Sequence, residues 1–172
     1  MTPDRVRWAV EVVDPGPEER LLEIGPGTGV AAALVCARLT TGHLLGVDRS
    51  TVAVDRTVKR NAGHVAAGRL TVRQASLAAL EVPSSSIDKV FSINVNVFWT
   101  RRPDRELAVV RRVLRPGGLL FVLYGAGGPT ADERITPVIA AALEDNEFTD
   151  ITRLRSEYGI GVRARTPERL RP

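Results

Sequence analysis

A glycine-rich turn that follows an acidic residue is the segment of this sequence best suited to ligand binding. Residues 23–29 read E-I-G-P-G-T-G, so Glu23 precedes Gly25, Gly27 and Gly29. Glycine lets the backbone turn sharply and approach a ligand, and a helix that begins after the turn points N–H groups at it. Asp48 comes 19 residues after Gly29, where a carboxylate can accept hydrogen bonds from both hydroxyls of a ribose. The spacing indicates a site for an adenosine-containing ligand.

The segments around this turn alternate between strand and helix patterns. Apolar runs predict strands over residues 20–24, 43–48, 70–74, 89–94 and 119–124, with helices over 30–39, 51–61 and 77–80 and from Pro103. A helix capped by Thr2 and running to Val13 is expected before them, and a helix over 131–143 and strands over 149–155 and 160–165 after them. Such alternation predicts a parallel sheet covered by helices on both faces. The short link between the last two strands permits only a hairpin.

Length and composition are those of one globular domain. The chain has 172 residues, 44% of them hydrophobic and 26% charged. We expect a single domain over 1–172, with a helix and linker over 1–19 and the core over 20–172. The sequence contains neither a long apolar run nor a secretory leader, and Cys36 is its one cysteine, so we expect a cytoplasmic protein with no disulfide and no membrane association.

The positive net charge is concentrated near the C-terminus. Residues 1–150 carry 18 basic and 18 acidic side chains, whereas residues 151–172 carry six arginines and two glutamates, which accounts for the net charge of +4. A basic tail can attract phosphate groups. Nucleic acid is nevertheless not the partner we expect, because 22 of the 24 basic residues are Arg, as a GC-rich genome would also produce.

Two interpretations of the glycine turn compete. The dinucleotide pattern G-x-G-x-x-G would place Val30 where its third glycine belongs, and Pro26 fills its first gap. The pattern E-x-G-x-G-x-G, with an acid after the next strand, instead resembles the first motif of class I S-adenosylmethionine-dependent methyltransferases. The segments GVDRS, LEVPSSSIDKVFSINVN and VLRPGGLLFVLY also resemble this family in the same order, so the likeness covers nearly the full length.

The resemblance implies a fold and an activity. The expected fold is a seven-stranded Rossmann-like sheet in the order 3-2-1-4-5-7-6, with the last strand antiparallel and helices on both faces. The expected activity is methyl transfer from S-adenosyl-L-methionine to a small-molecule acceptor, which leaves S-adenosyl-L-homocysteine, in a monomer or homodimer with no metal. The alternatives are a methyltransferase acting on RNA or protein, and a non-catalytic module that binds S-adenosylmethionine.

The resemblance also implies roles for individual residues. The three glycines would make room for the methionine and ribose parts of the cofactor, Asp48 would bind the ribose hydroxyls, and Glu23 would orient the turn or reach the cofactor amine. Arg49 could stack on adenine through its guanidinium plane. Ser76 stands where the family often has Asp, so we expect the adenine contact to come from Ser76 or from the Leu77 N–H.

The sequence assigns no catalytic residue and leaves Asn94 and Tyr124 as candidates; Tyr124 ends the fifth strand, where its hydroxyl could face the substrate. Asn94 and Asn96 straddle the end of the fourth strand, where related methyltransferases line the path between the cofactor methyl and the substrate, and strand alternation puts both on one face. Asn94 could equally line the pocket beside the cofactor or anchor its loop. Phe98 and Trp99 could form a pocket floor. The arginines at 101, 105 and 112 have helical spacing and predict a solvated face. His43 and His64 are expected at the opposite end of the sheet, so neither is a candidate base.

Overall fold

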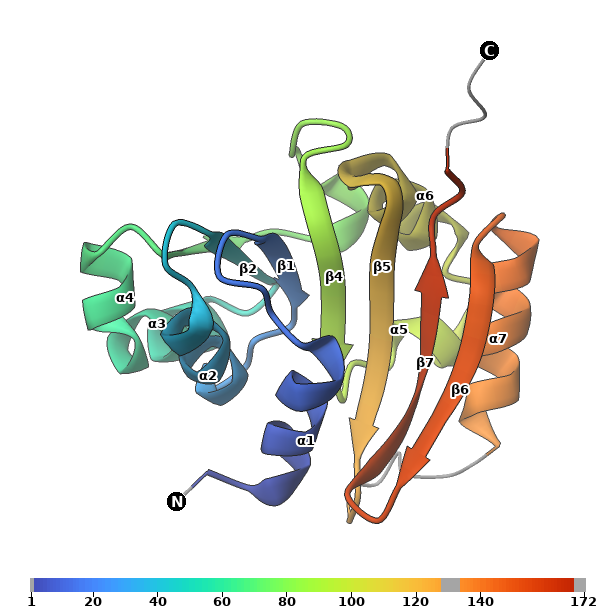
Figure 1. Cartoon of the computed structure of the whole chain (residues 1–172), viewed down its shortest axis with the longest axis horizontal. Coiled ribbons are helices and arrows are strands. Elements are labelled where there is room, and N and C mark those ends of the chain that lie inside the picture. The colour runs from blue at the N-terminus through green and yellow to red at the C-terminus, as the bar shows by residue number, and fades with distance from the viewer. Residues whose placement is uncertain (1, 128–133, 169–172) are drawn as a thin grey trace.

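Seven strands and a set of short helices make up the fold (Figure 1). The computed structural model describes residues 2–127 and 134–168. The strands are β1 (Arg20–Ile24), β2 (His43–Asp48), β3 (Leu70–Gln74), β4 (Ile87–Ile93), β5 (Leu114–Gly125), β6 (Thr149–Ser156) and β7 (Gly159–Arg165). The helices are α1 (Asp4–Val13), α2 (Val30–Arg38), α3 (Thr51–Arg60), α4 (Ala62–Ala66), α5 (Val97–Thr100), α6 (Asp104–Val113) and α7 (Ile135–Asp145), with a 3-10 turn η1 (Leu77–Ala79). None of these described helices is long and apolar enough to cross a membrane.

The strands form one sheet in the order β3-β2-β1-β4-β5-β7-β6, which confirms the order expected from the resemblance. Strands β1 to β5 pair in parallel, and β7 is antiparallel to both β5 and β6. The chain leaves β1 toward β2 and β3 and later returns to place β4 on the other side of β1. Because the winding reverses there, the carboxyl ends of β1 and β4 border the crevice where open sheets of this kind bind ligands.

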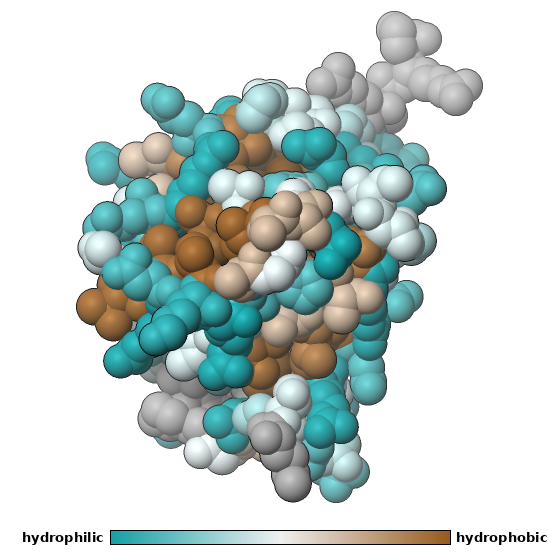
Figure 2. Space-filling view, turned by 90° about the vertical axis from the view of Figure 1, so that its left-hand side faces the viewer, coloured by the Kyte–Doolittle hydropathy of each residue, from teal (hydrophilic) through white to brown (hydrophobic). Residues whose placement is uncertain are grey.

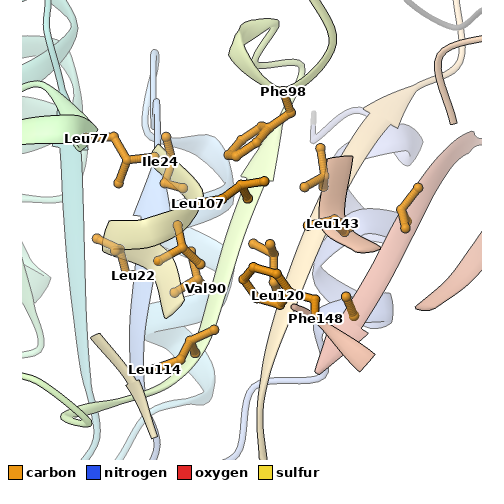
Figure 3. Close-up of a cluster of buried hydrophobic side chains, with 14 of the residues drawn as sticks. Leu22, Ile24, Leu77, Val90, Phe98, Leu107, Leu114, Leu120, Leu143 and Phe148 are labelled. Carbon is orange, nitrogen blue, oxygen red and sulfur yellow. The ribbon is translucent and has the colours of Figure 1, made fainter. Parts of the chain in front are cut away.

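Helices cover both faces of the sheet and bury its apolar side chains. Helices α1 and α2 lie in front of the sheet in Figure 1, and α6 and α7 lie behind it. Strand side chains alternate between faces, so Leu21 packs with α1 and α2 whereas Leu22 and Ile24 pack with α6. Figure 3 shows the second cluster, in which Leu107 of α6 meets side chains of β1, β4 and β5. The central strands are therefore buried on both sides, as parallel strands require.

Helices α3 and α4 lie on the left-hand side of Figure 1, beside the edge strand β3. Figure 2 shows this side, where hydrophobic residues gather in the middle and hydrophilic residues surround them. Among the exposed side chains here are Val52 of α3 and Val65 of α4, and the one buried residue of α3 is Thr57. The apolar side chains of α3 are thus at most partly buried, and its one fully buried residue is polar.

Several element boundaries differ from those expected from the sequence. Pro3, not Thr2, is the residue before α1; it is extended, with φ −62° and ψ 139°, and no side chain caps the helix. The expected cap by Thr2 is therefore wrong. Strand β5 already begins at Leu114, and α4 and α5 are additional short helices. Residues 131–133 of the last expected helix lie outside the described residues, and α7 begins at Ile135.

The edge of the sheet opposite β3 is formed by β6. Arg153 and Arg155 of this strand are exposed. The pairing of β6 with β7 shifts register between Thr149 and Thr152, and Asp150 in the shifted stretch has φ 50°. This edge is therefore both charged and irregular. The expected basic tail is partly built into it, while residues 169–172 lie outside the described residues.

Candidate active site

A cavity of about 490 Å³ opens at the carboxyl ends of β1, β2, β3 and β4. Six of the predicted ligand-binding residues line it: Gly25, Asp48, Arg49, Ser76, Leu77 and Asn94. The other predicted residues, Glu23, Gly27 and Gly29, are not on its wall. Asn96, Thr100, Arg101 and Glu106 contribute further polar groups. Sequence positions spread over 80 residues thus meet at the end of the sheet where ligands are expected.

The glycines of the turn all have left-handed backbone angles, with φ +69° at Gly25, +56° at Gly27 and +75° at Gly29. A Cβ on Gly25 would lie 2.8 Å from Cγ2 of Val95, and one on Gly29 would lie 2.9 Å from the Cα of Thr57. Both positions therefore require glycine. Gly25 allows close packing of the turn on Val95 at the cavity wall, whereas Gly29 allows close packing of the turn on α3.

Side chains from the end of α3 hold the glycine turn in place. Thr57 Oγ1, Arg60 Nε and Asn61 Nδ2 donate hydrogen bonds to the carbonyl oxygens of residues 27, 28 and 29, at 3.2, 2.7 and 3.0 Å respectively. Asn61 also donates to the carbonyl of Thr57 at 2.9 Å. These three residues are not predictable from the sequence pattern, because their role depends on how α3 docks on a turn about 30 residues earlier.

Asp48 is half-buried at the end of β2 and lines the cavity. Its Oδ1 accepts a hydrogen bond from the Ser50 N–H at 2.9 Å, which fixes the carboxylate at the start of α3. Arg49 is exposed beside it, and its carbonyl accepts from Nε2 of Gln74 at 3.2 Å, so the ends of β2 and β3 are tied together. A fixed carboxylate facing a cavity is well placed to accept hydrogen bonds from a vicinal diol.

Glu23 lies beneath the turn and is only 2% exposed. Burial, with a further contribution from the charge of Asp48, raises the pKa of its carboxyl group from 4.5 to about 8. Its Oε2 has no hydrogen-bond partner among the described residues. Glu23 is thus placed to support the turn from behind, and one buried oxygen remains available to a donor.

The cavity wall formed by the start of α6 was not predicted as part of the site. Glu106 is 6% exposed, and its Oε1 accepts a hydrogen bond from Nη2 of Arg101 at 2.5 Å. Arg101 was expected on a solvated helix face; its side chain is exposed as expected, but the helical placement is wrong, because Arg101 precedes α6 and its guanidinium pairs with this carboxylate at the cavity. Ser76, directly before η1, and the buried Leu77 line the same cavity.

The prediction that the Tyr124 hydroxyl faces a substrate is corrected by the structure. Tyr124 is fully buried, and its hydroxyl donates a hydrogen bond to the carbonyl of Val95 at 2.6 Å. Burial also raises the pKa of the phenol above its usual value. The side chain therefore supports the loop after β4 from within the core and is not placed to act as a base. Phe98 is likewise a core residue and not a pocket floor.

Asn94 lines the cavity and also anchors it. The residue has φ 60°, and its Oδ1 accepts a hydrogen bond from the Gly125 N–H at 2.9 Å, which links the ends of β4 and β5. Asn96 lines the cavity too, but it lies after β4 and directly before α5, so the expected strand alternation does not relate the two amides. Loop anchoring by Asn94 is observed, and a part in catalysis stays a prediction.

Both histidines lie away from the cavity, as predicted. His43 is the first residue of β2, and its Nδ1 lies 2.9 Å from the Gly68 carbonyl. His64 lies in α4 and contacts Arg69. Within residues 2–127 and 134–168, no three His, Cys, Asp or Glu side chains are grouped so as to hold a metal ion.

Comparison with known proteins gives a consistent result. A family model described as "Methyltransferase domain" matches residues 21–118. The chain is 27% identical over 164 residues to the malonyl-acyl-carrier-protein O-methyltransferase of Methylovorus sp. (strain MP688), covering 92% of this chain and 52% of that protein. It is 31% identical over 119 residues to a ubiquinone/menaquinone biosynthesis C-methyltransferase of Ruegeria sp. (strain TM1040), covering 67% and 47%. The chain thus spans about half the length of the curated relatives that it matches.

The fold is also similar to solved structures. A putative S-adenosyl-L-methionine-dependent methyltransferase from Methanococcus maripaludis superposes with a TM-score of 0.81, covering 98% of this chain and 86% of that one. Sequence identity in this pair is 12%, so the likeness concerns the fold.

Proposed function

We propose, from the premise that this chain belongs to the methyltransferase domain family, that it binds S-adenosyl-L-methionine and transfers the methyl group to a small-molecule acceptor. The observation that carries the proposal is the meeting of Gly25 and Asp48 on one cavity at the reversal point of the sheet. We also propose that the protein is cytoplasmic and that it is a monomer or a homodimer.

The residues around the cavity fit this cofactor. Asp48 would accept from the ribose hydroxyls, Arg49 would stack on the base, and Gly25, which has no side chain, would let the ligand approach the backbone of the turn. Glu23 lies beneath the turn and not on the cavity wall, so of the two roles that the resemblance implies, support of the turn is the one proposed. S-adenosylmethionine, when bound, supplies a methyl group carried on a sulfonium, and the sulfur leaves as the neutral thioether of S-adenosylhomocysteine.

The contribution of the chain itself is mainly one of positioning. Holding an acceptor in line with a reactive group can account for roughly 7–11 kcal/mol of a barrier. Asn94 and Asn96 can orient an acceptor by hydrogen bonds, but an amide does not take up a proton. The proposed acceptor is therefore one that arrives as a nucleophile, such as a carboxylate, a thiolate or an unprotonated amine.

Calorimetry tests the choice of cofactor. Titration of the chain with S-adenosylmethionine, S-adenosylhomocysteine and NAD should show binding of the two sulfur nucleosides and none of NAD, because the glycine spacing does not fit the dinucleotide pattern. Binding of NAD alone would overturn the proposal.

A variant of Asp48 tests the ribose ligand. Asp48→Ala should weaken binding of S-adenosylhomocysteine by about 1.5–3 kcal/mol, the range for a hydrogen bond to a charged group. The matched control is Asp55→Ala, because Asp55 is exposed on α3 and does not line the cavity. Equal affinities of the two folded variants would show that Asp48 is not the ribose ligand.

The acceptor class can be read from the transfer of label. Incubation with S-adenosylmethionine labelled in its methyl group, together with fractionated cell extract, should place label in the small-molecule fraction. Label in the RNA or protein fraction would show that the proposed acceptor class is wrong. Tight cofactor binding with no label in any fraction would favour the non-catalytic module.

A further inference from the structure

A second carboxylate, that of Glu106, lines the same cavity as Asp48. Glu106 lies in the first turn of α6 and is 6% exposed. Its ion pair with Arg101 uses Oε1, and the arginine side chain itself is 61% exposed. A carboxylate buried to this degree requires hydrogen bonds to compensate for lost hydration. The ion pair provides part of that compensation, and Glu106 therefore has the capacity to accept a further hydrogen bond from a ligand.

Glu106 is fixed relative to the segment that follows β3. Helix α6 packs against η1, and Arg112 near its other end donates to the carbonyls of Leu80 and Val82 at 2.9 and 2.5 Å. Ser76 directly precedes η1, and Leu77 is the first residue of this turn. Glu106 and residues 76–77 thus lie on one wall of the cavity, which the contacts between α6 and the segment after β3 hold together.

The polar groups on this wall differ in whether they donate or accept hydrogen bonds to a nucleobase. The Leu77 N–H can only donate, so it suits a ring nitrogen such as N7, which accepts hydrogen bonds in both adenine and hypoxanthine. A carboxylate accepts hydrogen bonds, so it suits an amino group. Adenine has both features, whereas hypoxanthine has a carbonyl oxygen in place of the amino group. A carboxylate facing that carbonyl would oppose two acceptors and leave a buried group without a partner, which is how polar sites reject analogues.

We propose that Glu106 accepts a hydrogen bond from the exocyclic amino group of the cofactor base and makes the site selective for adenine over hypoxanthine. Arg101 acts through Glu106 as a positioning residue, since its guanidinium fixes the carboxylate. This inference rests on the proposed function, because it takes Asp48 as the ribose ligand and so places the base in the same cavity, beside Ser76 and Leu77.

The experiment compares two ligands on the full chain. Calorimetry with S-adenosylhomocysteine and with its deaminated analogue, S-inosylhomocysteine, gives the ratio of their dissociation constants. The unmodified chain should prefer the adenine ligand by about 10- to 150-fold, the range for a hydrogen bond to a charged group. Glu106→Gln should reduce this preference to about threefold or less, because an amide can accept from an amino group or donate to a carbonyl.

Two further variants make the assignment specific. Glu147→Gln is the matched control, since Glu147 also pairs with an arginine, Arg111, but at an exposed position outside the cavity; it should keep the full preference. Glu106→Asp keeps the charge but withdraws it by one methylene, so it should also lower the preference. This second variant matters if Glu106→Gln fails a thermal melt.

The possible results separate the inference from the proposed function. An unchanged preference in folded Glu106→Gln, or a preference lost in Ser76→Ala instead, would overturn the role of Glu106 while cofactor binding stands. A chain that binds the adenine and hypoxanthine ligands equally would also overturn it. Failure to bind either ligand would instead count against the proposed function itself.

Discussion

Replacement of Glu23 by Gln should make the fold more stable at neutral and alkaline pH. The carboxyl group is buried beneath the glycine turn, and its pKa rises from 4.5 to about 8 chiefly through burial. Between these two values the folded chain binds a proton that the unfolded chain releases, so the free energy of unfolding falls as pH rises. This is the reverse of the usual behaviour of a paired carboxylate. The loss begins near pH 4.5 and is complete above about pH 8.

The size of the effect follows from the two pKa values. One pKa unit corresponds to about 1.36 kcal/mol. Relative to its value at low pH, the free energy of unfolding is therefore lower by about 3 kcal/mol at pH 7 and by about 5 kcal/mol above pH 8. Gln has nearly the same shape and cannot ionise. The stability difference between Glu23→Gln and the unmodified chain should therefore grow by about 3 kcal/mol between pH 4.5 and pH 7.

Denaturant unfolding from pH 4.5 to 8.5 measures this difference directly. The control is Glu11→Gln, because Glu11 is exposed on α1 and its replacement should leave the pH dependence unchanged. If the curves for Glu23→Gln and the unmodified chain stay parallel across this range, burial does not hold the Glu23 carboxyl in its protonated form and the reasoning fails.

Three other changes test separate parts of the structure. Tyr124→Phe removes the hydrogen bond to the Val95 carbonyl and should lower the free energy of unfolding by about 1 kcal/mol; a melt identical to that of the unmodified chain would contradict this. The double change His43→Ala and His64→Ala should leave turnover within about twofold once an acceptor is known, and a hundredfold loss, roughly the minimum credited to a general base, would refute the placement of both residues. Gly29→Ala introduces a Cβ at φ +75° and 2.9 Å from the backbone of α3, so it should destabilise the chain by about 1–3 kcal/mol in thermal melts, and no loss would show that the turn can relax.

The strands could be predicted because a buried parallel strand is marked by a short run of apolar residues, which is a local feature of the sequence. The predicted ranges for β1, β2 and β3 agree with the structure, since each is a short apolar run between turn residues. The carboxyl ends of parallel strands meet at one edge of the sheet, which predicted the place of Asp48, and the family resemblance added Ser76 at the same edge.

The errors arose where a side chain's direction depends on packing between distant elements. The face that Tyr124 presents is set by the pairing of β5 with β4 and β7, and that register is not encoded locally. Arg101 was assigned to a helix face by its spacing, but α6 begins three residues later. The polar contacts of Thr57, Arg60 and Asn61 depend on the docking of α3, and the sequence carries no periodic signal for them.

The charged, irregular edge strand β6 has a consequence for association between copies of the chain. An edge strand presents unpaired N–H and C=O groups that can template pairing with another chain, and charged side chains or bulges are known means of preventing this. Arg153 and Arg155 would place like charges opposite one another if two such edges met, and the register shift near Asp150 bends the strand away from a flat partner. Arg153 and Arg155, two of the arginines that raise the net charge near the C-terminus, can thus oppose sheet extension and aggregation, and this role needs no phosphate-bearing partner.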